Sequence, residues 1–378
     1  MPLDKIKREF ITFMEEVRSG EPYAKNFMGC LISTIIEPEP ISQERMMELT
    51  GYSQATVSLT LQKLQFLMPI RTIRKIGDRK RYYTYDGPPE RFVLDLWKTR
   101  VDAQTIDIKQ IESVTEGMNK KPIRDSAFQR FMVYLKNMHL YLKLVYDLRN
   151  KGIAEFAHVL ETGSYESLGL QSTKSLEKGI LAEFLEKIRL VSLEYDSNRT
   201  LTSKIDKDYL LSKNEYYSKL KTNLNPLYSQ TVANQMIVIH DVFVEGCTTQ
   251  DELEKSTLLP RSTISEVLTQ AVKIGIIGVT KKPGSRIKMY QPTISFTDLM
   301  LGNYDQVARH VSIVMPRLSE YILMVKRTRS KSKETKKFLE VLKSLEKAYA
   351  FTRDFSNSTK VEMVIRLKEE YDRGFVFI

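Results

Sequence analysis

Cysteine and histidine are scarce in this chain, and neither forms a recognisable group. The 378 residues include two cysteines and four histidines. Two cysteines are too few for a disulfide framework. The histidines stand singly, without the spacing of metal ligands or of a catalytic set: His139, His158, His240 and His310. No phosphate-binding glycine loop is present either, so we expect no structural metal, no cofactor and no enzymatic activity.

Long apolar runs are also missing. No stretch of about 18 or more apolar residues occurs, and the first 17 residues mix acids with bases where a signal peptide would have an apolar centre. We therefore expect a cytoplasmic protein without a membrane segment. A hydrophobic share of 42% is ordinary for a globular protein, and a chain of this length holds about two or three domains.

The composition has an excess of positive charge. Fifty-eight Lys and Arg residues against 47 Asp and Glu give a net charge of +11 and a pI near 9.3. This excess favours a polyanionic partner, although it also suits a membrane surface or plain solubility. The position of the basic residues must therefore decide between these interpretations.

An internal repeat organises the chain. A shift of 207 positions, without a gap, aligns ten identical residues over about forty positions. Gln43, Thr50, Thr56, Ser58, Leu61, Ile70, Lys75, Gly77, Arg79 and Tyr83 recur as Gln250, Thr257, Thr263, Ser265, Leu268, Ile277, Lys282, Gly284, Arg286 and Tyr290. The repeated stretches cover about residues 1–150 and 208–357, so the repeated element is a whole domain.

A linker separates the two copies. The polar stretch 195–203 lacks apolar periodicity, which is typical of a connecting segment. We therefore place a boundary near residue 205, with one unit in residues 1–205 and a homologous unit in residues 206–378.

Each copy is expected to be mainly helical, with long helices beside a small β-structure. Apolar residues at three- and four-residue spacing predict amphipathic helices over residues 127–149 and 335–352. A further helix is expected at residues 176–193, where it could cover one of these apolar stripes.

The centre of the first copy predicts a winged helix-turn-helix. Ser42 is suited to cap a short helix over residues 43–49, and Ser53 a second one over residues 54–66 after the turn at Gly51. Two short strands around Gly77 then predict a hairpin, the wing. Six cations lie within eleven positions of this wing.

These features predict contact with DNA. Small polar groups on the outer face of the second helix can bond to base edges and phosphates in a major groove. Cations on the wing can neutralise phosphates, and Arg79 at its tip can enter the minor groove. The predicted contacts in the first copy are Ser53, Gln54, Thr56, Ser58, Gln62, Arg71, Arg74, Lys75, Asp78, Arg79, Lys80 and Arg81.

The second copy repeats the pattern with a different surface. Thr249 is expected to cap a helix over residues 250–255, and the next helix covers residues 261–274. Its wing is less basic, so the two copies would read different sequences, or the second would bind mainly backbone. Its predicted contacts are Arg261, Ser262, Thr263, Ser265, Gln270, Lys281, Lys282, Arg286 and Lys288.

The run MMELTGYSQATVSLTLQKLQ, followed by RKIGDRKRYY, resembles the MarR superfamily of regulators, and in particular its GbsR-like branch. The resemblance implies a DNA-binding winged helix flanked by dimerising helices and, in many members, a small-molecule effector. It further implies that Asp78 steadies Arg79 at the wing tip. Ser285 replaces this aspartate in the second copy, which puts its wing role in doubt.

Ordinary members of that family pair two chains, whereas this chain carries both copies. The resemblance therefore implies an intramolecular pseudo-dimer held by the helices at 127–149 and 335–352. A homodimer of tandem chains is the alternative.

A transcriptional regulator, with repression favoured over activation, is the leading functional hypothesis. An architectural, chromosome-associated DNA-binding protein and a winged-helix adaptor for other proteins are the alternatives.

Several other features keep two interpretations. The basic run 326–333 is either a backbone-binding arm or a solvated helix connection. Cys247 fits an inert residue better than a redox sensor, and Cys30 belongs to an apolar helix. The frequent tyrosines fit packing better than an aromatic cage for a cationic ligand: Tyr134, Tyr141, Tyr146, Tyr216 and Tyr217.

Overall fold

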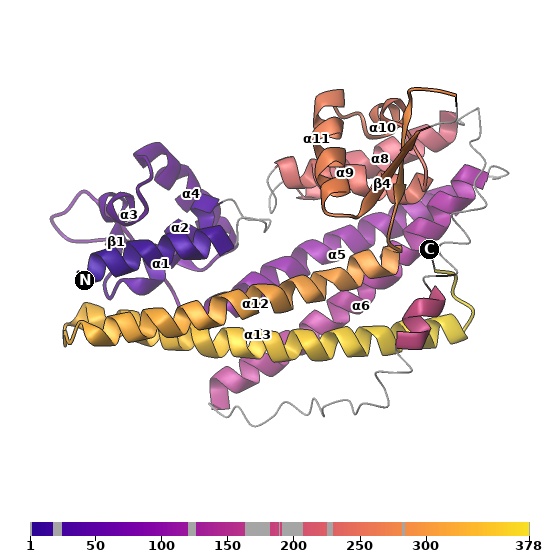
Figure 1. Cartoon of the computed structure of the whole chain (residues 1–378). Helices are drawn as coiled ribbons and strands as arrows, with labels where there is room; N and C mark the ends of the chain where they lie inside the picture. Colours follow the sequence, from indigo (N-terminus) through magenta and orange to yellow (C-terminus); the bar gives the residue numbers. More distant parts are fainter. Residues whose placement is uncertain are drawn as a thin grey trace. The chain divides into compact units, whose positions relative to one another are not determined.

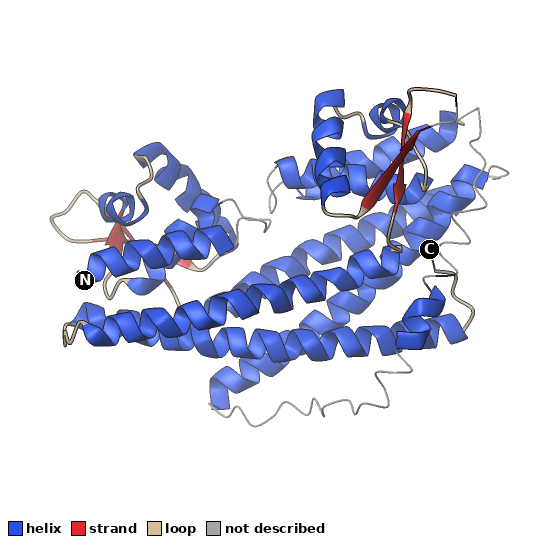
Figure 2. Ribbon diagram, in the orientation of Figure 1, coloured by secondary structure: helices blue, strands red, loops and turns tan. Residues whose placement is uncertain are grey.

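The structure is a computed structural model that describes residues 2–17, 25–119, 126–162, 182–188, 190, 207–224, 230–281 and 284–377. Helices dominate it, and two small antiparallel sheets complete it (Figure 2). The expectation of a mainly helical chain with small β-hairpins is confirmed. The linker predicted at 195–203 and the boundary near residue 205 lie outside the described residues.

The chain forms two compact units, and each is assembled from separate stretches of sequence. Unit 1 contains residues 1–100, 151–166 and 306–357, and unit 2 contains residues 101–150, 167–305 and 358–378. Each unit therefore combines residues from both copies of the repeat. The division into units is a different one from the division into repeats.

Four long helices contribute residues to both units. All four exceed in length the helices predicted at 127–149 and 335–352, and the turns added to those two also bury apolar side chains, such as Phe156 and Leu367. Their bounds are α5 (Arg91–Asn119), α6 (Ser126–Thr162), α12 (Phe296–Arg327) and α13 (Lys333–Asp372) (Figure 1).

The N-terminal part of unit 1 has two helices, followed by the predicted helix pair and hairpin. A short strand adds to the hairpin to give a three-stranded sheet of order β1-β3-β2. The elements are α1 (Leu3–Val17), α2 (Lys25–Ile36), β1 (Ile41–Ser42), α3 (Gln43–Thr50), α4 (Gln54–Leu67), β2 (Ile70–Arg74) and β3 (Arg81–Tyr85).

Helices of the second copy complete the core of unit 1. Phe10 of α1 is fully buried, with ring centroids 5.3 Å from Tyr321 of α12 and 5.6 Å from Phe338 of α13. Trp97 of α5 packs in the same way on Phe355, at 5.2 Å. Large aromatic side chains dominate the apolar area that a core removes from water. Side chains of the second copy therefore complete the core around the first copy.

The second copy repeats the element order within unit 2. Its elements are α8 (Lys207–Leu224), α9 (Gln230–Glu245), α10 (Gln250–Thr257), α11 (Arg261–Lys273), β4 (Ile277–Lys281) and β5 (Lys288–Pro292). A helical segment at residues 182–188, within the helix expected at 176–193, belongs to the same unit.

In unit 2, a helix of the first copy likewise completes the core of the second copy. Phe131 of α6, which stands 207 positions before Phe338, is fully buried against two tyrosines of α8. Its ring centroid is 6.0 Å from Tyr209 and 5.9 Å from Tyr216. Each predicted amphipathic helix thus packs on the leading helix of the opposite copy.

Candidate nucleic-acid interface

The first helix pair, α3 and α4, begins at the residues expected to cap it. The Ser42 hydroxyl accepts a hydrogen bond from the backbone N–H of Arg45, and Ser53 accepts one from Thr56. Between the helices Gly51 takes the left-handed conformation, with φ +74°, which costs glycine little. Both caps and the turn follow the predicted pattern.

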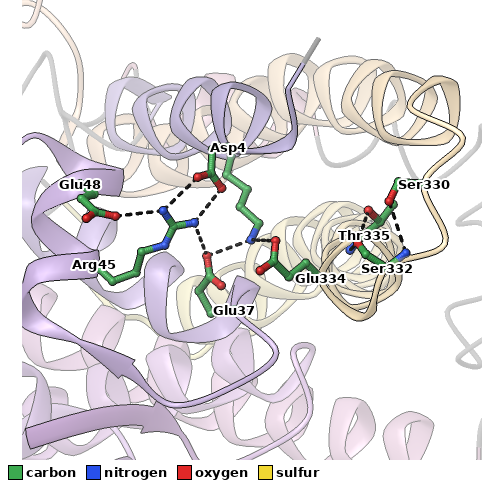
Figure 3. Close-up of polar contacts among 9 residues, drawn as sticks. Asp4, Glu37, Arg45, Glu48, Ser330, Ser332, Glu334 and Thr335 are labelled. Carbon is green, nitrogen blue, oxygen red and sulfur yellow. Dashed lines mark hydrogen bonds and ion pairs between the residues drawn. The ribbon is translucent and has the colours of Figure 1, made fainter.

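Arg45 fixes α3 to the body of unit 1. Its guanidinium binds Asp4 of α1 at 2.7 and 2.9 Å, and it also contacts Glu48 at 3.1 Å and Glu37 at 3.4 Å (Figure 3). The hydrogen bond from Arg45 holds the pKa of the Asp4 carboxyl below its usual value. Arg45 therefore has a structural role and takes no part in the candidate interface.

The outer face of α4 carries the predicted polar residues, together with two apolar ones that were not foreseen. Gln54 and Gln62 are exposed, whereas Thr56 and Ser58 are half-buried. Leu59 and Phe66 are 62% and 83% exposed. Seven residues apart, they lie on one side of the helix. They stand outside the buried stripe of Val57, Leu61 and Leu64, which is the signal that could have identified them.

The first hairpin, β2 and β3, turns at Gly77, whose φ is +81°. Asp78 orders this turn: its carboxylate accepts hydrogen bonds from the Lys80 backbone N–H at 2.9 Å and from the Tyr82 hydroxyl at 2.6 Å. These two bonds, led by that of Tyr82, lower the pKa of Asp78.

The role that the resemblance gave Asp78 needs a correction. In the part of the chain that the structure describes, neither a hydrogen bond nor an ion pair joins Asp78 to Arg79. The carboxylate is turned back into the loop, where it meets the Lys80 amide and Tyr82. Asp78 shapes the turn that presents Arg79.

The six cations of the first hairpin are exposed but not equally free. Arg71 pairs with Asp86, Lys80 pairs with Glu44 at 3.2 Å, and Lys75 lies 4.2 Å from the centre of the Tyr82 ring. The remaining three make no ion pair within the described residues: Arg74, Arg79 and Arg81. Their charge is available to an anionic partner.

A groove of about 330 Å³ is lined by α3, α4 and the first hairpin. Polar side chains from both elements line it, with Gln62 and Ser58 on one side and Arg81 on the other. Gln65 of α4 donates to the Thr72 hydroxyl at 2.7 Å, and Gln43 of α3 donates to Tyr83 at 3.2 Å. These bonds hold the helix and the hairpin in one fixed surface.

The second copy reproduces the strand register of this region. Ile41 pairs with Tyr83 in the first sheet, and Thr248 bridges Tyr290 at the positions 207 further on. The five residue pairs of β4 and β5 are likewise those of β2 and β3 shifted by 207. Thr249 and Glu252 form a reciprocal capping box at the start of α10.

The predicted contacts of the second copy are mostly exposed, and some have partners. Arg261 is paired with Asp251, and Gln270 accepts from Gln235 at 2.8 Å. Ser262 and Ser265 are exposed, and Thr263 is half-buried. Three exposed hairpin cations have no ion pair in the described residues: Lys281, Arg286 and Lys288. Lys282 lies outside the described residues.

Ser285 orders the turn of the second hairpin in the way that Asp78 orders the turn of the first. Its hydroxyl accepts from the Ile287 backbone N–H at 3.1 Å, the bond equivalent to that between Asp78 and Lys80. Gly284 also takes a left-handed conformation, with φ +72°. The second hairpin, β4 and β5, therefore keeps the turn of the first without its negative charge.

The structure also shows the surroundings of the cysteines and tyrosines singled out in the sequence. Cys30 is fully buried, and burial raises the pKa of its thiol to about 12, whereas Cys247 is half-buried. Tyr134, Tyr141, Tyr216 and Tyr217 are buried in the core of unit 2. Among the described residues, no group of His, Cys, Asp and Glu could hold a metal ion. In the same residues, no helix combines the length and apolarity needed to cross a membrane.

Comparison with known proteins adds no relative. No family model matches the chain, and no curated protein is significantly similar to it.

Proposed function

We propose that the chain is a regulator of transcription that binds double-stranded DNA through two winged helix-turn-helix elements. The observation that carries this proposal is the fixed surface of unit 1. Arg81 lines the same groove as Ser58 and Gln62 of α4. Arg81 and two further arginines of the same hairpin, Arg74 and Arg79, make no ion pair within the described residues. A helix with small polar groups fits the major groove, and a basic hairpin fits the adjacent phosphates.

The parts of this surface have different tasks in the proposal. Gln54 and Gln62 of α4 read base edges, since glutamine bonds well to adenine. Arg74 and Arg81 bind phosphates, and Arg79 enters the minor groove from the hairpin tip. Occupation of a promoter by such a protein blocks polymerase, so repression is the proposed direction.

The exchange of helices between copies supports an intramolecular pseudo-dimer. In this proposal one chain supplies both reading elements, and the covalent link replaces the pairing of two chains. Analytical ultracentrifugation at micromolar concentration tests it: a single species near 43.9 kDa is expected, and a species of twice that mass means a homodimer of tandem chains.

DNA binding itself is tested with an Arg79→Gln, Arg81→Gln variant. Loss of two phosphate contacts is expected to weaken duplex binding and to reduce the slope of log K against log salt by about two. Fluorescence anisotropy over a salt series measures both quantities. An unchanged slope contradicts a role of the hairpin in DNA binding.

Sequence specificity separates a regulator from an architectural protein. Selection from a random duplex library is expected to yield a defined site, bound roughly a thousandfold or more above random duplex. A preference below about tenfold favours the architectural alternative.

The exposed Leu59 and Phe66 favour a second candidate, an adaptor that binds another protein through α4. Apolar side chains so placed are typical of protein interfaces, although they also suit thymine methyl groups. A Leu59→Gln, Phe66→Gln variant separates the two. Retained duplex affinity together with loss of a protein partner supports the adaptor.

A further inference from the structure

A second strongly basic segment lies in unit 1, outside the helix pair and hairpin. Residues 326–333, the basic connection, join α12 to α13 and read KRTRSKSK. Five of the eight residues are cations, all exposed, and none is acidic. The segment contains no apolar side chain, so neither a protein core nor the interior of a membrane would accommodate it.

Local hydrogen bonds give this connection a defined path. Thr328 donates its backbone N–H and its hydroxyl to the Val325 carbonyl, at 3.2 and 2.8 Å. Arg329 adopts a left-handed backbone, with φ +52°. Ser332 then caps α13 by accepting from the Thr335 N–H at 3.2 Å (Figure 3). A segment ordered in this way loses little further entropy when it binds.

The connection contacts the loop that leads into β1, the strand that pairs with β3 of the first hairpin. Lys333 forms an ion pair with Glu39, which precedes β1. The hydrogen bond from Lys333 lowers the pKa of Glu39, and Lys75 of the hairpin adds to that effect. Two cations, one from each segment, therefore act on one carboxylate.

A buried lysine of α1 contacts the residue that follows the connection. Lys7, fully buried, contacts Glu37 at 2.8 Å and Glu334 at 3.8 Å (Figure 3). Glu334 directly follows the basic connection, and Glu37 leads toward β1. Ion pairs thus tie the C-terminal end of the connection to the loop before β1 and to α1.

Most of the charge on the connection has no partner. Within the described residues, a carboxylate pairs with Lys333 alone; four cations make no ion pair: Lys326, Arg327, Arg329 and Lys331. Exposed like charges repel one another, and attraction to an anion that lies among them offsets this repulsion. A polyphosphate backbone running along the hairpin would supply that anion.

We propose that the basic connection is a second phosphate-binding segment of unit 1, which holds the DNA backbone alongside the first hairpin. This inference rests on the proposed function and extends its surface. The hairpin belongs to the first copy and the connection to the second. The DNA surface of unit 1 is therefore composite, and neither copy carries it alone.

The test uses the full chain with Arg327→Gln, Arg329→Gln and Lys331→Gln combined. Binding to a duplex is followed by anisotropy across a salt series. We expect the Kd at physiological salt to rise about tenfold or more and the log–log salt slope to fall by about two to three. The loss should be equal on specific and random duplexes, because phosphate contacts carry no sequence information.

Two further variants control the result. A Lys343→Gln, Lys347→Gln, Arg353→Gln chain removes three exposed cations from α13 and is expected to bind within about twofold of the parent. Arg327→Lys with Arg329→Lys keeps the charge and is expected to retain most of the affinity. Thermal melts of all chains establish that they fold.

The outcomes separate this inference from the proposed function. If the triple connection variant matches the α13 control while Arg79→Gln, Arg81→Gln weakens binding, the connection does not touch DNA and the inference fails alone. If the parent chain binds no duplex, both fail. Loss of binding to phosphatidylserine vesicles with unchanged duplex affinity also overturns the inference, in favour of a lipid surface.

Discussion

Arg74 and Arg81 stand directly opposite each other as the last residue pair of the first hairpin. Lys281 and Lys288 form the equivalent pair of the second hairpin. Like charges in this position destabilise an antiparallel pair. Both copies nevertheless place two cations there, which is understandable when an anion binds between them.

Replacing one cation should therefore move stability and binding in opposite directions. Arg81→Gln removes the repulsion and is expected to raise the free energy of unfolding by roughly 0.2–0.5 kcal/mol, while duplex affinity falls about fivefold or more. Urea denaturation and anisotropy measure the two effects. Lys343→Gln, which removes an exposed helical cation, should change neither. A variant that gains or loses both properties together contradicts this explanation.

Asp78 and Ser285 predict a graded effect at the hairpin turn. Asp78→Ser and Asp78→Ala both remove the charge, but serine can still accept the Lys80 amide, as Ser285 accepts that of Ile287. We expect the serine variant to bind duplex DNA about twofold or more tighter than the alanine variant. Slower amide exchange at Lys80 should accompany it. Equal affinity and exchange in the two variants would mean that the bond does not order the turn.

His240 predicts a loss of stability in acid. Burial lowers its pKa from 6.5 to about 4, and its Nδ1 atom has no hydrogen-bond partner in the described structure. The folded state thus binds the proton more weakly than the unfolded state. Stability from this group is complete above pH 6.5 and falls by about 3 kcal/mol on reaching pH 4.

Comparison with His240→Gln isolates this contribution, because other groups titrate in the same range. The difference in unfolding free energy between parent and variant should depend on pH between 6.5 and 4. His158→Gln, which removes an exposed imidazole, serves as the control. A pH-independent difference for His240→Gln rejects the prediction.

The exchange of helices predicts that neither half folds alone. A fragment of residues 1–205 lacks Tyr321 and Phe338, which cover Phe10. Expressed separately, residues 1–205 and 206–378 should aggregate or remain disordered; expressed together, they should purify as a 1:1 complex. Size-exclusion chromatography with light scattering decides, and a monomeric fragment with a cooperative melt contradicts the prediction.

A double-mutant cycle examines the same exchange in the intact chain. Phe10→Ala and Phe338→Ala should each cost about 3–5 kcal/mol. Because the two rings touch, the double variant should depart from additivity by about 0.5 kcal/mol or more.

Local elements were predictable because their causes are local. The caps at Ser42 and Ser53, the turns at Gly51 and Gly77, and the inward stripe of α4 depend on neighbouring residues, and the structure has each where the sequence indicated it. The 207-residue repeat likewise matched the register of both hairpins.

Partners distant in sequence were not predictable. The pairing of Lys80 with Glu44 depends on the folded sheet. The periodicity of residues 335–352 does not indicate which helix covers them. An apolar stripe predicts that one face of a helix is buried, but not which element packs on that face. The packing of Phe338 on Phe10 is therefore a fact of the tertiary structure.

The interleaving of the two copies also constrains how the chain can change over time. A substitution at Phe338 alters the core of unit 1, and one at Phe131 alters the core of unit 2. A substitution at one of these core positions therefore changes the packing of a residue from the other copy. Positions on the hairpin turns, such as Asp78 and Ser285, make no core contact of this kind, so they can differ between the copies without a change in the shared core.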